Sequence, residues 1–160
     1  MNPYAAYLAG RDPTVILAST SLRLEEITRV LHPSEAERPP APGKWSARDI
    51  MCHLADTEVV FAFRLRQALA EPHHTIQPYD QNRWASPYPG YQIGAALDVF
   101  TTVRNWNLAL LRNVCDEDLA RPVTHPERGT MTFQTLVETM AGHDLNHLQQ
   151  LDAIASAQKL

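Results

Sequence analysis

The chain has 160 residues, of which 44% are hydrophobic and 20% charged, a balance typical of one globular domain long enough to bury a core. We therefore expect a single domain over residues 1–160. The net charge of −4 argues against a nucleic-acid-binding protein, which would show a basic patch or stripe.

The cysteine content and the lack of long apolar runs indicate in which cellular compartment the protein is expected. Cys52 and Cys115 have no C-x-x-C partner, so a cysteine-rich zinc site is excluded, and Cys52 is interpreted as a small buried hydrophobe. The first residues lack the basic and apolar regions of a secretory signal. No apolar run approaches the roughly 18–20 residues that span a bilayer. We expect a cytoplasmic protein with reduced thiols and no membrane partner.

The first two long helices are predicted from capping residues. Asp12 followed by proline marks a helix start, and the apolar spacing carries this helix over residues 13–31. After a proline-rich loop, Ser46 is the expected N-cap of a second helix, and Asp49 takes the place of the acid in a capping box. This helix is expected over residues 46–70.

The segment 72–90 is irregular and rich in proline and aromatic residues. A loop of this length in a small domain is usually functional or disordered, and the aromatic content argues against disorder. We expect an ordered cover over one end of the molecule. Its aromatic side chains either belong to the core or line a pocket: Tyr79, Trp84 and Tyr88.

Two further helices complete the pattern. Apolar residues at helical spacing predict a third helix over 93–114, and the connection 115–131 has room for a short hairpin. Thr132 is the expected N-cap of a last helix that runs to about Ala157. Four amphipathic helices of about twenty residues each favour an all-α four-helix bundle, a fold that builds metal sites between facing helices.

The last helix places two histidines, four residues apart, on its apolar face. His143 and His147 are surface neighbours at this spacing and are placed to bind one metal ion. The alternative is a pair of core histidines that hydrogen-bond to other groups. A third histidine at a matching place would favour the metal site, and His53 in the second helix is the candidate. The stripe consists of Leu136, Met140, His143, His147, Leu151 and Ile154.

Three segments resemble one family in order and at fitting separations. Residues 42–56, PGKWSARDIMCHLAD, resemble the start of the second helix in DinB-like proteins. Residues 131–134, MTFQ, followed by 143–148, HDLNHL, resemble the last helix of that family. Residues 79–85, YDQNRWA, are similar to a loop of its YfiT-like branch.

The resemblance implies a fold and a ligand set. It implies a four-helix bundle with up-down-down-up connections, in which one histidine of the second helix and two of the last bind a divalent metal, often nickel or zinc. Carried over, the ligands are His53, His143 and His147. Three imidazoles with an open position are typical of catalytic rather than structural sites, and nitrogen ligands suit several metals.

Residues near the expected ligands have two interpretations each. Asp56, one turn after His53, is placed to orient an imidazole or to act as a general base, unless it is a helix-surface acid. Gln150 follows His147 by one turn and is placed to hydrogen-bond a water or a substrate. The favoured interpretation is a solvated polar side chain. Asp144 lies about 100° from the stripe and is predicted to be a surface charge.

Other polar and aromatic residues are assigned structural or surface positions. Trp45 is expected to pack across the start of the second helix, and Arg104 is expected on a solvated helix face, as are the other scattered arginines. Four histidines lie in loops without ligand spacing and are interpreted as structural or surface residues: His32, His73, His74 and His125.

The functions left open belong to different classes. The first is a small metal-dependent hydrolase that uses metal-activated water on a small-molecule substrate. The resemblance equally implies an S-transferase that takes a low-molecular-weight thiol as cosubstrate. The others are a non-catalytic metal-binding stress-response module and a metal-free structural bundle. Dimerisation is common in the family, so a homodimer is expected.

Overall fold

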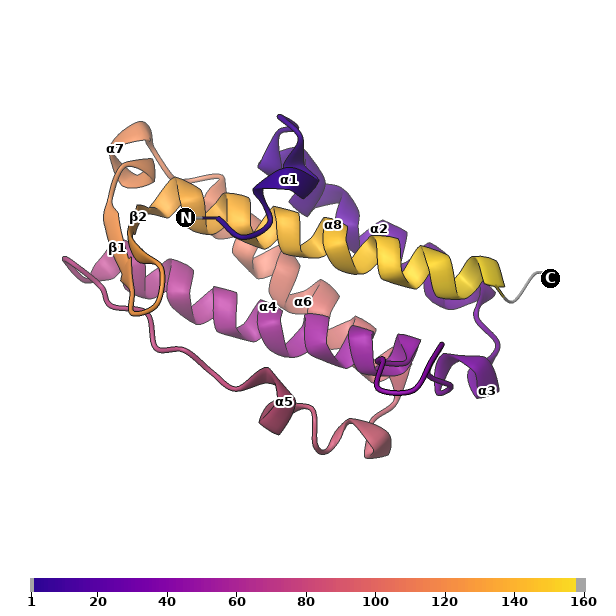
Figure 1. Cartoon of the computed structure of the whole chain (residues 1–160). Helices are drawn as coiled ribbons and strands as arrows, with labels where there is room; N and C mark the ends of the chain where they lie inside the picture. The colour runs from indigo at the N-terminus through magenta and orange to yellow at the C-terminus, as the bar shows by residue number, and fades with distance from the viewer. Residues whose placement is uncertain (1, 158–160) are drawn as a thin grey trace.

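The computed structural model describes residues 2–157 and is dominated by four long helices (Figure 1). These are α2 (Pro13–Val30), α4 (Ala47–Ala70), α6 (Ile93–Leu111) and α8 (Phe133–Ala157). The shorter elements are α1 (Ala5–Leu8), α3 (Pro33–Ala36), α5 (Gln81–Trp84), the 3-10 helix η1 (Tyr88–Gly90), α7 (Asp116–Leu119), β1 (Pro122–His125) and β2 (Gly129–Thr132). The expected four-helix bundle is confirmed.

The helices begin at the predicted caps. The Asp12 carboxylate accepts a hydrogen bond from the Thr14 N–H at 2.8 Å. Ser46 and Asp49 form a reciprocal capping box, each side chain accepting from the other residue's backbone N–H. At the start of α8 the Thr132 hydroxyl accepts from the Thr135 N–H. The third helix ends at Leu111, three residues before the predicted end.

The helices run up, down, down and up. In Figure 1, α2 and α8 run in one direction, whereas α4 and α6 run in the other. Because α4 and α6 are adjacent and parallel, their connection must return along the bundle before α6 begins. The segment 71–92 therefore runs lengthwise beside α4, carrying α5 and η1. The prediction that it covers one end of the bundle was wrong.

The predicted hairpin is present between α7 and α8. Strands β1 and β2 pair antiparallel with Val123 opposite Met131, and both side chains are buried. The sequence did not predict α1, which packs against α8. Within residues 2–157, no helix has the length and apolar character needed to cross a membrane.

The core consists of two apolar clusters with a polar layer between them. One cluster uses the second half of α2 and the first halves of α4 and α6, and the other uses the opposite halves. Residues between these halves are polar and buried on each of the four helices. They are Thr20 of α2, His53, Thr57 and Glu58 of α4, Arg104 and Asn107 of α6, and His143, Asp144 and His147 of α8.

Candidate metal centre

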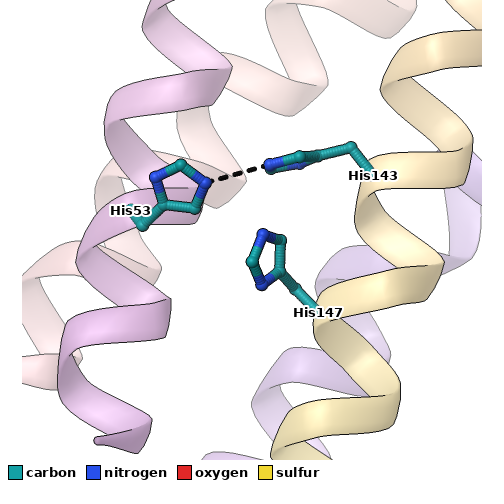
Figure 2. A group of neighbouring side chains, drawn as sticks. All are labelled: His53, His143 and His147. Carbon is teal, nitrogen blue, oxygen red and sulfur yellow. Dashed lines mark hydrogen bonds between the residues drawn. The ribbon is translucent and has the colours of Figure 1, made fainter. Parts of the chain in front are cut away.

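Three histidines converge in the polar layer. His53 projects from α4 toward α8, whose His143 and His147 lie one turn apart on the facing side (Figure 2). One ring nitrogen from each lies within 4.8 Å of the others. The Nε2 atoms of His53 and His143 are 3.0 Å apart. The three residues proposed from the sequence are thus brought together from two helices.

The three ring nitrogens are close enough together to be candidate ligands of a single divalent cation. Zinc–nitrogen bonds of about 2.0–2.1 Å in a tetrahedral site place neighbouring nitrogens roughly 3.3 Å apart, close to the separation of the two Nε2 atoms. All three side chains are buried. Burial lowers the pKa of His53 to about 3 and lowers the pKa of His143 and His147 as well. The imidazoles are therefore neutral at pH 7, which is the form that binds a metal.

Hydrogen bonds around the rings orient them. The Oε1 of Gln150 lies 3.0 Å from His147 Nδ1 and can only accept, so Nδ1 carries the proton and Nε2 is left with a free lone pair. Gln150 is exposed, as the sequence predicted, and it is also a hydrogen-bond partner of the site. Thr57 Oγ1 lies 3.5 Å from His53 Nε2 and shares a hydrogen bond of 2.8 Å with the Tyr79 hydroxyl.

A buried ion network lies in the same layer. Arg104 donates to both carboxylate oxygens of Glu58 and of Asp144, at 2.7–3.2 Å. Thr20 also donates to Asp144, and Asn107 donates to Glu58. The predictions of a solvated Arg104 and a surface Asp144 were wrong. In a bundle whose central helices are covered on several sides, a position about 100° from one buried stripe faces another helix.

Two cavities lie beside the three histidines. His53 and His143 line a cavity of about 410 Å³ together with Thr57, Tyr79 and Arg64. His147 and Gln150 line a second cavity of about 740 Å³, whose walls include Trp45 and Ile154. Tyr4 borders both cavities and packs edge-on against His143, with ring centroids 5.4 Å apart. A small molecule therefore has space beside the histidines in either cavity.

Trp45 packs against the core at the start of α4, as expected, and it also reaches the site. Its ring lies against the His53 ring, with centroids 4.8 Å apart, and lines the larger cavity. It therefore contacts the site instead of only packing across the start of α4. No described residue hydrogen-bonds the buried Nδ1 of His53.

Asp56 is not drawn into the histidine cluster. Its carboxylate accepts a hydrogen bond from the Tyr88 hydroxyl at 2.8 Å, and burial raises its pKa. Of the three loop aromatics, Tyr79 lines the smaller cavity, Tyr88 is fully buried and Trp84 is largely exposed. The role of Asp56 as a general base stays a prediction.

The loop histidines stay outside the cluster. His125 is buried, lines the smaller cavity and accepts a hydrogen bond from the Glu127 N–H through Nδ1. His32 is exposed and bonds to Ser34, whereas His73 is exposed with a positive φ of 54°. Sequence reasoning missed Tyr4, because a single aromatic residue ahead of a four-residue helix has no periodic pattern.

Several known proteins are similar to this chain in sequence. A family model described as the DinB superfamily matches residues 17–151. An Oceanobacillus iheyensis protein named "putative metal-dependent hydrolase" is 29% identical over 113 residues, which are 70% of this chain and 66% of that protein. The match thus spans just under two thirds of that relative. A Bacillus cereus protein of the same name is 24% identical over 132 residues, 82% of this chain and 76% of that protein.

Two solved structures have a similar fold. YfiT from Bacillus subtilis, described as "a probable metal-dependent hydrolase with an unusual four-helix bundle topology", has a TM-score of 0.86 at 21% identity. The superposition covers 92% of this chain and 86% of YfiT. A DinB-like protein from the same organism, YjoA, has a TM-score of 0.65 at 16% identity, with 92% of each chain covered.

Proposed function

The chain belongs to the DinB superfamily, and on that premise we propose that it is a metal-dependent hydrolase whose His53, His143 and His147 hold one divalent cation. The observation that carries the proposal is the convergence of three buried, neutral imidazoles at the walls of two cavities. Three protein ligands leave a coordination position for water or substrate, the arrangement of catalytic sites. Imidazole donors suit zinc and nickel, the two metals that we propose.

The residues around the cation would have different roles in hydrolysis. When bound, a divalent cation supplies Lewis acidity, polarising a substrate oxygen and lowering the pKa of water. Gln150 holds His147 in the tautomer that leaves Nε2 free. Burial raises the pKa of Tyr79, so its hydroxyl stays protonated and, with Thr57, offers a hydrogen bond to a substrate oxygen that gains charge. Hydrolysis adds the water hydroxyl to the acyl or phosphoryl group and its proton to the leaving group.

Asp56 has a supporting role in this proposal. Its hydrogen bond from Tyr88 joins α4 to the η1 segment, which belongs to the connection that also carries Tyr79. Asp56 would therefore position that connection beside the site. The alternative role of general base predicts loss of kcat for Asp56→Asn, whereas the supporting role predicts the same loss for Tyr88→Phe, which keeps the carboxylate.

Metal content is the first test. Protein purified without a metal-affinity tag should contain about one zinc or nickel per chain by elemental analysis, and His53→Ala and His147→Ala should lose it while keeping their helical content. His32→Ala, which changes an exposed histidine outside the cluster, should retain it. Stoichiometric metal in His147→Ala, or no metal in the wild type after reconstitution, would overturn the assignment.

Turnover is the second test. The metal-loaded protein should hydrolyse esters, amides or phosphoesters without added thiol, and chelation should abolish the activity. Turnover that requires a low-molecular-weight thiol would favour the S-transferase implied by the sequence resemblance, and metal binding without turnover would favour the non-catalytic module. The homodimer and the cytoplasmic location also stay predictions. Cys52 and Cys115 are both free thiols.

A further inference from the structure

The cavity beside His53 and His143 contains two arginines without carboxylate partners. Arg64 projects from α4 and Arg128 from the β1–β2 turn, and both line the cavity. Neither forms an ion pair with any residue in the range 2–157, whereas seven other arginines do. A cation without a partner at the wall of a cavity is a ready site for an anion.

Arg64 belongs to the face of α4 that carries His53. His53, Thr57, Phe61 and Arg64 follow the spacing of one helical face, and all four line this cavity. One N–H of Arg64 donates to the Gln77 carbonyl at 3.1 Å, and its guanidinium lies 5.8 Å from the centroid of the Tyr79 ring. These two contacts hold the side chain on the cavity wall.

Most of the hydrogen-bonding capacity of Arg64 is unused. A guanidinium has five N–H donors, and the Gln77 carbonyl accepts from one of them. The side chain is half-buried, and burial together with the charge of Arg128 lowers the pKa of Arg64. An anion in the cavity would offset the repulsion between Arg64 and Arg128. It would also accept hydrogen bonds from the guanidinium of Arg64, which burial removes in part from water.

The acidic residues at the cavity wall leave the arginines free. Asp80 accepts from the backbone N–H groups of Asn82 and Arg83 as the N-cap of α5, and it pairs with the Arg83 side chain. Glu127 is exposed and, within the described chain, forms no ion pair. The cavity wall thus carries two arginines and one carboxylate, that of Glu127, that form no ion pair within the described chain.

On the basis of the proposed hydrolase function, we propose that Arg64, assisted by Arg128, binds an oxyanion group of the substrate, a carboxylate or a phosphate, while the bond to be cleaved lies at the three histidines. Arg64 lies eleven positions after His53, which is about 16 Å along the axis of α4. The arginine side chain shortens this span. The substrate class is therefore a small organic acid or phosphate ester whose anionic end lies several bonds from the cleaved one.

Direct binding tests the anion site without turnover. Acetate and inorganic phosphate are titrated separately into chelator-treated protein, and binding is followed by heteronuclear NMR. Comparison of the two titrations distinguishes a carboxylate site from a phosphate site. At least one probe should bind and shift the signals of Arg64, Tyr79 and Arg128. Arg64→Gln should weaken that binding about tenfold or more, because charge-assisted hydrogen bonds are lost. Arg112→Gln, at the exposed end of α6, should bind as the wild type does.

The outcomes separate the two proposals. The site is overturned if neither probe binds the wild type, or if Arg64→Gln binds as tightly as the wild type. Kinetics on metal-loaded protein compare the mono-para-nitrophenyl ester of glutaric acid with the neutral para-nitrophenyl butyrate. Arg64→Gln should raise KM for the anionic ester alone, and an equal effect on both esters contradicts the anion site. If neither ester is hydrolysed, the result counts against hydrolysis of these esters. The NMR titration then decides on the anion site independently.

Discussion

Arg104 of α6 holds Asp144 of α8 through two hydrogen bonds, at 2.7 and 3.2 Å, in the fully buried layer that contains the histidines. Asp144 directly follows His143, and the same guanidinium binds Glu58, which lies five residues after His53 on α4. One cation therefore ties together the two helices that supply the candidate ligands. It also donates to the Leu17 carbonyl of α2, so all four long helices meet at this point.

Replacing Arg104 by methionine is expected to destabilise the protein strongly. The substitution leaves Glu58 and Asp144 buried without their cation, and breaking a buried pair in this way costs about 3–5 kcal/mol. The free energy of unfolding of chelator-treated protein, measured with urea, checks the expectation. Arg112→Met at the exposed end of the same helix is the matched control and should change stability by less than about 0.5 kcal/mol. A loss below about 1 kcal/mol for Arg104→Met would contradict the structure.

Gly142 is expected to be intolerant of even a methyl group. A Cβ at this position of α8 would lie 2.6 Å from Tyr4 Cβ and 2.7 Å from the Tyr4 carbonyl oxygen. Gly142→Ala should therefore displace the N-terminal segment, cost about 1–3 kcal/mol and remove the contact between Tyr4 and His143. The control is Gly94→Ala on α6, where the added Cβ would meet no described atom within 4 Å apart from the local helix backbone, and the change should stabilise by up to about 1 kcal/mol. Equal effects of the two substitutions on urea unfolding would show that α1 does not pack as described.

The bundle and its histidines could be predicted because they leave local and periodic signals. The capping residues Ser46 and Asp49 predict the start of α4, and the four-residue spacing of His143 and His147 places both rings on one apolar face. The Arg104–Asp144 pair leaves no such signal. A charged residue on an amphipathic helix is read as solvated unless the packing of a third helix against it is known. The lengthwise course of the segment 71–92 likewise follows from the parallel directions of α4 and α6, which only the tertiary fold reveals.

Gln150 is expected to tune metal affinity without being a ligand. Its Oε1 accepts a hydrogen bond from the Nδ1–H group of His147, and loss of such a partner typically weakens metal binding about 10–100-fold. Gln150→Ala should therefore need more zinc for half-saturation in a competition titration with a chromogenic chelator, while its stoichiometry stays at one ion. Gln149→Ala changes an exposed neighbour of the same type and is the control. Unchanged zinc affinity in Gln150→Ala would mean that the ring of His147 is held by packing alone.

The metal-free protein is expected to lose stability as the pH falls below about 6.5. Burial lowers the pKa of His53 to about 3, and it lowers the pKa of His143 and His147, so the folded state binds fewer protons than the unfolded chain below the ordinary histidine pKa. The free energy of unfolding should then fall by about 1.4 kcal/mol per pH unit for each histidine that stays neutral. For His53 this loss continues until the pH approaches its folded pKa. Urea unfolding of chelator-treated protein between pH 6.5 and 5.5, before most carboxylates titrate, measures the slope. His53→Gln should reduce the slope by about one histidine's share, and an unchanged slope would mean that His53 accepts a proton in the folded protein.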